Sequence, residues 1–107
     1  MSRFRLSFQV PETHLEEVKA AVFAAGAGTT GEGYDQCCFQ VRGEGQFRPL
    51  AGSNPRVGET GKLERLTEYR VETICADRRT LEAAVAALRS AHPWEQPAFE
   101  AWPLEAL

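Results

Sequence analysis

The sequence is poor in the residues that most often build catalytic and metal centres. Its 107 residues include only two histidines, three cysteines and one methionine. No stretch approaches the roughly 20 apolar residues that cross a bilayer, and the first residues lack the apolar run of a signal peptide. We therefore expect a cytoplasmic protein with no membrane partner. Its cysteines are expected to be reduced, because three cannot all pair within one chain.

The chain also lacks an excess of positive charge. Its 12 basic and 15 acidic residues give a formal net charge of −3, and the two signs are interspersed along the sequence. A nucleic-acid-binding surface has to neutralise phosphates with clustered basic side chains. The composition therefore argues against a nucleic acid as a partner. A chain of this length buries one core, so we expect residues 1–107 to form a single domain.

What the sequence does contain is a strand–helix–strand pattern that occurs twice. In the first half, the alternation of apolar and polar residues over 4–10 predicts a strand. A capping box that begins at Thr13 then predicts an amphipathic helix, which ends at a pair of glycines. The next alternation, over 34–42, predicts a second strand. The residues that this strand is expected to turn towards the core are Cys37, Phe39 and Val41.

The second half follows an excursion over 43–61, where glycines and prolines break both periodicities and leave one short strand near 46–50. The alternation over 62–75 predicts a third strand, the longest of the chain. Asp77 is a good N-cap for a second helix, and a closing strand lies around 99–102. The order βαββαβ predicts an α+β fold of the ferredoxin-like, split βαβ type. Such a fold has an antiparallel sheet with two helices on one face.

The opposite face of this sheet has no helix to cover it. Ile74, Trp102 and Cys38 lie out of phase with the expected core residues, so we expect them on that open face. Apolar side chains there favour self-association through the sheet. The charges that alternate along the third strand, and are expected to form cross-strand ion pairs, are Glu68, Arg70 and Glu72.

Several motifs resemble a known family. Residues 92–99 read His-Pro-Trp-Glu-Gln-Pro-Ala-Phe, which is similar to the His-Pro-Tyr-Glu-x-Pro signature of CutA-type proteins, trimeric relatives of the PII fold. Further motifs, in the right order, extend a closer resemblance over nearly the whole chain; they lie at 34–37, 43–49, 52–55, 58–61 and 68–72. This set resembles the YqfO-type insert domain of the dinuclear-metal NGG-interacting-factor-like (Nif-three-like) family, here as a free-standing chain.

The resemblance implies a CutA/PII-like fold and a homo-oligomer, with a trimer favoured over a dimer. It implies no activity, because in the longer relatives the two metal ions are held by a flanking domain that this sequence does not contain. Trp94 stands where the family more often has a tyrosine, so a role of that hydroxyl is not carried over.

Few residues are available to bind a metal ion. We expect the two helices to run roughly parallel, which would put His14 and His92 at opposite ends of the sheet. A divalent-metal site made of His92, Glu95 and Cys37, across a subunit interface, remains open. In the alternative, His92 donates to the last carbonyls of its helix and Trp94 packs at the turn that follows this helix.

The glycine-rich excursion offers a second candidate site. Exposed amides among its glycines, with basic side chains nearby, suit a phosphate or a carboxylate. In the alternative, the glycines only allow tight turns and a sheet extension that contacts a neighbouring subunit. The candidate ligand-binding residues are Tyr34, Cys37, Arg48, Asn54, Lys62 and Trp94.

The sequence contains no nucleophile with an evident base to orient it, so we expect no enzyme. The favoured function is a non-catalytic, homo-oligomeric regulatory or binding module, with a divalent metal ion or a small anionic ligand bound at a subunit interface. The alternative is a structural partner that docks in trans onto a larger, dinuclear-metal protein.

Overall fold

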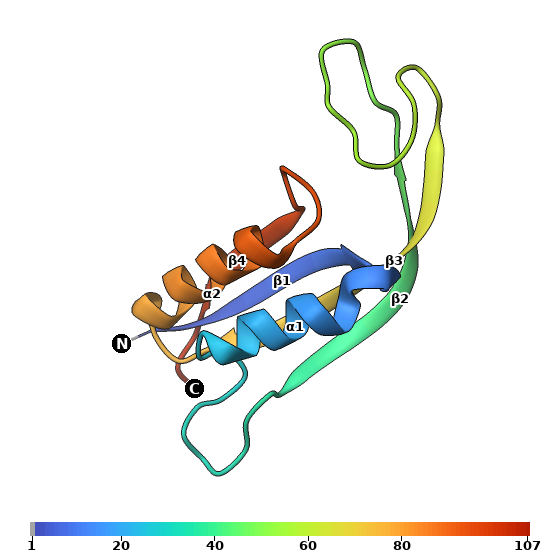
Figure 1. Cartoon of the computed structure of the whole chain (residues 1–107). Coiled ribbons are helices and arrows are strands. Elements are labelled where there is room, and N and C mark those ends of the chain that lie inside the picture. The colour runs from blue at the N-terminus through green and yellow to red at the C-terminus, as the bar shows by residue number, and fades with distance from the viewer. Residues whose placement is uncertain (1) are drawn as a thin grey trace.

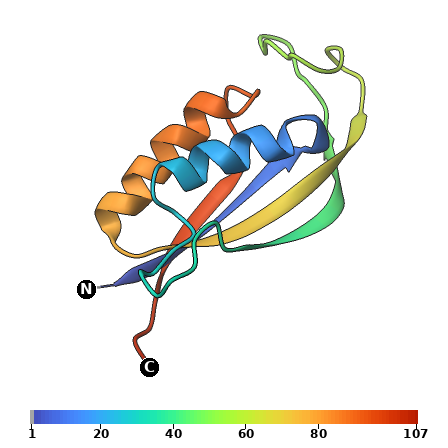
Figure 2. The ribbon, with the colours of Figure 1, turned by 60° about the horizontal axis from the view of Figure 1, so that its bottom comes forward.

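The structure, a computed structural model, describes residues 2–107 as four strands and two helices arranged in two layers (Figures 1 and 2). In chain order the elements are β1 (Arg3–Pro11), the 3-10 turn η1 (Glu12–His14), α1 (Leu15–Ala24), β2 (Cys38–Phe47), β3 (Glu64–Cys75), α2 (Arg78–Ala91) and β4 (Phe99–Leu104). The sheet has the order β2-β3-β1-β4, and every neighbouring pair is antiparallel. Both helices cover one face. The predicted α+β, split βαβ fold is therefore confirmed.

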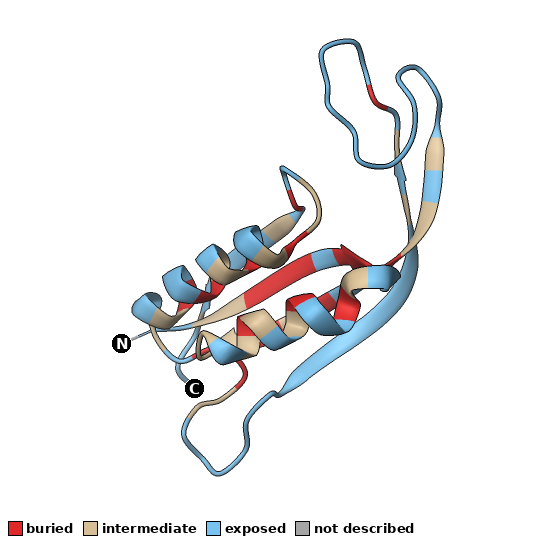
Figure 3. Ribbon diagram, viewed as in Figure 1, coloured by how far each residue is buried: buried red, intermediate tan, exposed pale blue. Residues whose placement is uncertain are grey.

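The core lies between the helices and the two central strands, β1 and β3 (Figure 3). β1 sits between β3 and β4, and its alternate residues Leu6, Phe8 and Val10 are at most 1% exposed. Full burial of a side chain of this size contributes about 1.5–3 kcal/mol. The buried residues that the helices add to this cluster are Leu15, Val18, Val22, Leu81, Ala84 and Leu88.

The two helices begin in different ways. The Asp77 carboxylate accepts a hydrogen bond of 2.8 Å from the backbone N–H of Thr80, which confirms the predicted N-cap and lowers the pKa of Asp77. The capping box predicted at Thr13 is wrong. A 3-10 turn precedes α1, whose N-cap is His14, and the Thr13 hydroxyl lies 2.9 Å from the His14 ring Nδ1. The hydroxyl is thus engaged by a side chain instead of a helix N–H.

β2 begins and ends later than predicted. It spans Cys38–Phe47 instead of 34–42, and it continues through Gly43 and Gly45 into the region predicted as an excursion. Glycine lowers strand propensity, but β3 supplies a continuous partner along this whole length. Pairing with a neighbouring strand therefore overrides the local glycine signal.

The register of β2 also reverses the predicted direction of its side chains. Cys38 pairs with Thr73, a buried residue of the helix-covered face, so Phe39 and Val41 face the open side. The Lys19 ammonium of α1 accordingly donates to the Gln40 side chain at 2.9 Å. The predictions that Phe39 and Val41 face the core, and Cys38 the open face, are both wrong. A shift of one residue moves every side chain of a strand to the other face.

The far end of the β2–β3 hairpin extends beyond the rest of the sheet (Figure 1). β1 pairs with β3 only as far as Glu68, whereas β2 stays paired with β3 to Glu64. We call residues 44–67, which include the connecting loop, the arm. It helps to give the molecule a longest dimension of 47 Å against 24 and 23 Å for the other two. None of the helices in the described chain is long and apolar enough to cross a membrane.

Candidate functional site

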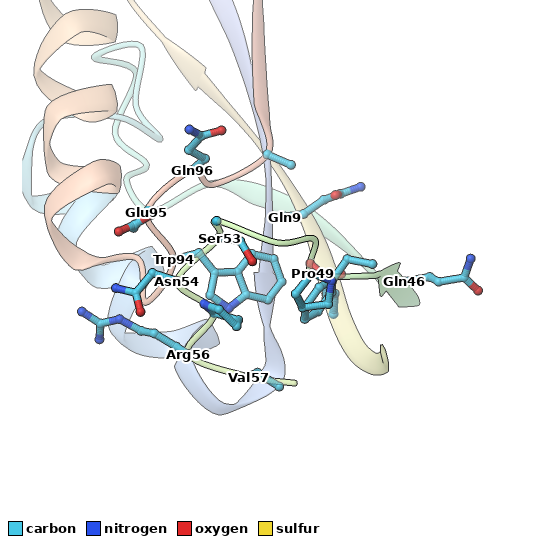
Figure 4. A pocket seen from close by; sticks show the side chains of 15 residues that line it. Gln9, Gln46, Pro49, Ser53, Asn54, Arg56, Val57, Trp94, Glu95 and Gln96 are labelled. Atoms are coloured by element: carbon cyan, nitrogen blue, oxygen red, sulfur yellow. The ribbon is translucent and has the colours of Figure 1, made fainter. Parts of the chain in front are cut away.

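A cavity of about 750 Å³ lies between the arm and the connection from α2 to β4 (Figure 4). The arm contributes residues 49 and 52–57, and the connection contributes residues 94–96 and 98. Gln46 and Phe47 at the base of the arm, with Gln9 of β1 and Glu68 of β3, complete the wall. A volume of this size is typical of sites for small organic molecules.

The corner after α2 fixes one wall of the cavity through His92. This residue is 6% exposed, and its ring Nε2–H donates to the Gln9 carbonyl oxygen of β1 at 2.8 Å. The other ring nitrogen, Nδ1, accepts from the backbone N–H of Trp94 at 3.1 Å. Burial lowers the pKa of His92, in keeping with a neutral ring whose two nitrogens are both engaged. The predicted helix-capping contact is made by the His92 backbone N–H, which donates to Leu88.

The indole of Trp94 contacts two aromatic rings. Its centroid lies 5.3 Å from the His92 ring, edge to face, and 5.8 Å from the Phe47 ring at the end of β2. Such tilted contacts are the favoured geometry of aromatic pairs. The arm and the α2–β4 corner therefore meet through Phe47 and Trp94, which form the aromatic part of the cavity wall.

Glu68 is the buried charged residue of the wall. It is 8% exposed, and within the described chain its Oε1 atom is buried without a hydrogen-bond partner. Its other oxygen lies over Gly45, where an added Cβ would overlap the carboxylate. Burial raises the pKa of Glu68 because water no longer stabilises the charge.

The prediction that Glu68, Arg70 and Glu72 form cross-strand ion pairs is wrong in the described chain. Arg70 and Glu72 lie on the same strand, with the Arg70 Nε and a Glu72 oxygen 3.8 Å apart, and Glu68 is left out. The site residues predicted from the sequence did not include Glu68. The available signal was Gly45 within β2, since a glycine inside a strand often marks the close approach of another group.

The six predicted ligand-binding residues are divided between the two ends of the molecule. Asn54 and Trp94 line the cavity. Arg48 and Lys62 lie on the arm outside the cavity wall, where the Lys62 ammonium pairs with Glu59 at 2.9 Å. Tyr34 and Cys37 precede β2 at its opposite end, and both are exposed.

The predicted metal ligands do not meet within one chain. β2 has ten residues and begins just after Cys37, whereas His92 and Glu95 lie near its other end, next to the cavity. At about 3.3 Å per residue, the ends of this strand are roughly 30 Å apart. Across residues 2–107, no three His, Cys, Asp or Glu side chains are grouped to hold a metal ion.

The expected separation of the two histidines is also wrong. His14 lies close enough for its charge to contribute to the lowered pKa of His92. Since β1 and β3 are antiparallel, the helices that follow them run in opposite directions. The start of α1 and the end of α2 therefore lie at the same end of the sheet.

The thiols are placed away from both imidazoles. Cys75 is buried in the core, and burial together with the nearby charge of Asp77 raises its pKa to about 11. Cys37 and Cys38 are exposed at the start of β2, and the Cys37 Sγ lies 3.7 Å from the Asp35 carbonyl oxygen. None of these contacts activates a thiolate.

Comparison with known proteins identifies relatives of several times this length. No family model matches the chain. It is 46% identical over 95 residues to the GTP cyclohydrolase 1 type 2 homolog of Mycobacterium leprae, a match that covers 89% of the chain and 24% of the relative. The protein of the same name from Bacillus subtilis is 40% identical over 101 residues, or 94% of the chain and 26% of the relative. The chain thus spans about a quarter of the curated relatives it matches.

Solved structures give the same assignment. A Bacillus cereus protein related to NIF3 superimposes with a TM-score of 0.79 at 37% identity, over 98% of the chain and 26% of that protein. The divalent cation tolerance protein CutA from Archaeoglobus fulgidus has a TM-score of 0.66 at 14% identity, over 97% of the chain and 85% of that protein. GlnK of B. subtilis superimposes with a TM-score of 0.61 at 8% identity, over 97% of the chain and 86% of that protein. The chain is therefore homologous to about a quarter of these longer, NIF3-related proteins, as its resemblance to the YqfO-type domain predicts, and it has the fold of CutA and GlnK.

Proposed function

We propose that the chain is a non-catalytic binding module that works as a homo-oligomer and uses the open face of the sheet and the arm for self-association. The observation that carries this proposal is the apolar character of the open face. Phe39, Val41 and Trp102 are 67%, 39% and 41% exposed there. Ile74 lies on the same face, because Ile74 of β3 and Trp102 of β4 are both paired with Arg5 of the strand between them. Exposed apolar surface of this kind is typical of interaction sites.

The charges of the open face suit a second copy of the same face. Positive and negative side chains lie between the apolar ones on this face: Arg70 is paired with Glu72 on β3, and Arg5 of β1 and Glu100 of β4 lie on the same face. A face that carries both signs in similar number is complementary to itself when a symmetry axis relates the copies. Self-association therefore buries the apolar groups without a net repulsion.

The arm supports the same proposal. Leu50, Val57 and Leu63 are 61%, 40% and 48% exposed on it, although they are apolar. Because the arm projects past β1 and β4, its outer part has no layer of the same chain to pack on. A neighbouring subunit would supply that layer. The resemblance to the trimeric CutA-type proteins makes a trimer the expected assembly.

The chemistry of the chain favours binding over catalysis. His92, the histidine at the cavity, uses both ring nitrogens to hold the corner in place. Cys75 is buried with a raised pKa, and the exposed thiols lie at the far end of β2. In the described chain the exposed thiols lie far from both imidazoles, whereas the cavity offers space and polar contacts for a ligand.

Light scattering coupled to size-exclusion chromatography tests the assembly. We expect a mass of about three times 11.8 kDa at micromolar concentration. Phe39→Glu should reduce the mass to that of one chain, because it puts a charge into the apolar face. Tyr34→Glu is the matched control, since Tyr34 is an exposed aromatic outside the strands, and it should leave the assembly intact. A wild-type protein that remains a single chain at high concentration would refute the proposal.

A second candidate function is docking in trans onto a larger protein. The observation in its favour is that the relatives contain this domain within chains about four times as long. Mixing the chain with a longer NIF3-related protein, followed by chromatography, tests it. A stable mixed complex that Phe39→Glu abolishes, together with a wild-type chain that is monomeric alone, would favour docking over self-association.

A further inference from the structure

The carboxylate of Glu68 lacks the compensation that a buried charge requires. It is 8% exposed, and within the described residues its Oε1 atom has no hydrogen-bond partner. Arg70, its neighbour on the same strand face, is engaged by Glu72. A buried carboxylate without a partner is costly, and charged donors form the strongest hydrogen bonds with it. A donor from outside the chain would supply the missing partner.

The cavity that Glu68 lines suits a cation with an apolar body. Phe47 and Trp94 form an aromatic wall, and aromatic faces attract cations. Two carboxylates and one guanidinium line the cavity, from Glu68, Glu95 and Arg56. Figure 4 shows that the Arg56 and Glu95 side chains are both directed away from the Trp94 indole, which leaves Glu68 as the charged group of the interior. The interior therefore carries a negative charge next to aromatic rings.

We propose that this cavity binds a small organic cation, an ammonium or amidinium group on an apolar or aromatic body, with Glu68 as its counter-ion and Trp94 and Phe47 as the walls that hold the body. This assignment rests on the proposed binding function and names its ligand class.

Gly45 gives the site its geometry. A Cβ at this position would overlap the Glu68 carboxylate, so the absence of a side chain allows the carboxylate to lie where it does. At Gly43, on the same strand, the nearest atom to an added Cβ is 4.0 Å away. The two glycines thus form a matched pair, and the requirement for glycine is specific to the position beneath Glu68.

Correlation NMR of the two indole N–H groups tests the proposal in the full chain. Trp94 reports on the cavity and Trp102 on the open face, and Trp102→Phe assigns the two signals. Benzylamine should shift the Trp94 signal and leave that of Trp102 in place. It should bind at least about tenfold more tightly than benzyl alcohol, its neutral analogue, because of the charge-assisted contact. Benzoate, the anion of similar shape, should not bind.

Two glutamate variants distinguish a specific contact with the Glu68 carboxylate from a general effect of negative charge near the cavity. Glu68→Gln should weaken benzylamine binding by at least about tenfold, since it removes the buried charge. Glu95→Gln, at an exposed position of the same wall, should change the affinity by less than about threefold. Thermal unfolding of each variant shows that it is folded, and the wild-type protein without added amine gives the reference.

Three outcomes would overturn the inference. Benzyl alcohol could bind as well as benzylamine, Glu68→Gln could retain full affinity, or benzylamine could shift neither indole signal. If Glu68→Gln instead reduces the mass of the assembly while benzylamine does not bind, the carboxylate pairs with a second copy of the chain. The self-association proposal is judged separately, because Phe39→Glu should bind benzylamine normally even as a single chain.

Discussion

Replacing Glu68 by glutamine should make the protein more stable at neutral pH. The side chain is 8% exposed, and its Oε1 atom is buried without a partner in the described chain. Glutamine has nearly the same shape and carries no charge. The substitution therefore removes the desolvation penalty of the carboxylate while it leaves the packing against Gly45 almost unchanged.

The size of the gain follows from the cost of an unsatisfied buried group. That cost is about 1–3 kcal/mol for a neutral group and more for a charged one. Since the glutamine amide is also only partly satisfied, we expect a net gain of about 1–2 kcal/mol in the free energy of unfolding. For a domain of this length, each kcal/mol raises the melting temperature by about 4–8 °C.

The pH dependence gives the sharper test. Because burial raises the pKa of Glu68, the folded protein favours the neutral acid. The wild-type protein should lose stability as pH rises from the unfolded pKa of about 4.3 through the higher folded pKa, and the whole penalty applies above it. Denaturant unfolding at a series of pH values should therefore show that wild type and Glu68→Gln have similar free energies of unfolding near the unfolded pKa of about 4.3. The variant should then gain its advantage as pH rises.

Glu72→Gln is the control for this experiment. Glu72 lies on the same face of β3, but it is paired with Arg70 at 3.8 Å and its side chain is 33% exposed. Its removal should cost less than about 1 kcal/mol and should give no advantage that grows with pH. Equal stability of wild type and Glu68→Gln at all pH values would refute the claim that the carboxylate is an uncompensated charge.

Three further predictions use other positions. Gly45→Ala should displace Glu68 and abolish benzylamine binding, whereas Gly43→Ala should not; equal binding by both variants would contradict the close contact. Since burial lowers the pKa of His92, the neutral ring supports the fold, and stability should decline as pH falls below about 6.5. Denaturant unfolding should show less of this decline in His92→Gln than in wild type, and an unchanged decline would count against the role of the ring. Cys75 should react with a chromogenic disulfide reagent only after unfolding, while the other two cysteines react in the folded protein; fast reaction of all three would contradict its burial.

The face of β2 illustrates what alternation alone leaves open. Phe39 and Val41 alternate with polar residues, as core residues do, so the sequence favoured the covered side for them. They lie instead on the open face, while Gln40 contacts Lys19 of α1. Periodicity reports that two faces differ in polarity. Periodicity does not report which of the two faces the helices cover, because here the open face carries apolar residues as well.

The candidate site was predictable in part for a similar reason. Trp94 and Asn54 could be selected because they occur in turn-rich segments with unusual motifs. Glu68 resembled an ordinary surface charge within an alternating strand, and nothing local distinguished it from Glu72. The difference arises because Glu68 leans over Gly45 on a neighbouring strand, whereas Glu72 has a guanidinium beside it.

The sequence by itself determined the order of the two helices and the four long strands, because capping residues such as Asp77 and the periodicity of β1 are local properties of the chain. The separate short strand expected near 46–50 does not form, since β2 extends to Phe47. The tertiary structure alone decided which distant segments meet. Antiparallel pairing of β1 with β3 brings the end of α2 to the base of the arm, so Trp94 meets Phe47 and moves away from Cys37. Strand direction and register depend on the whole sheet, and the cavity at Glu68 is their product.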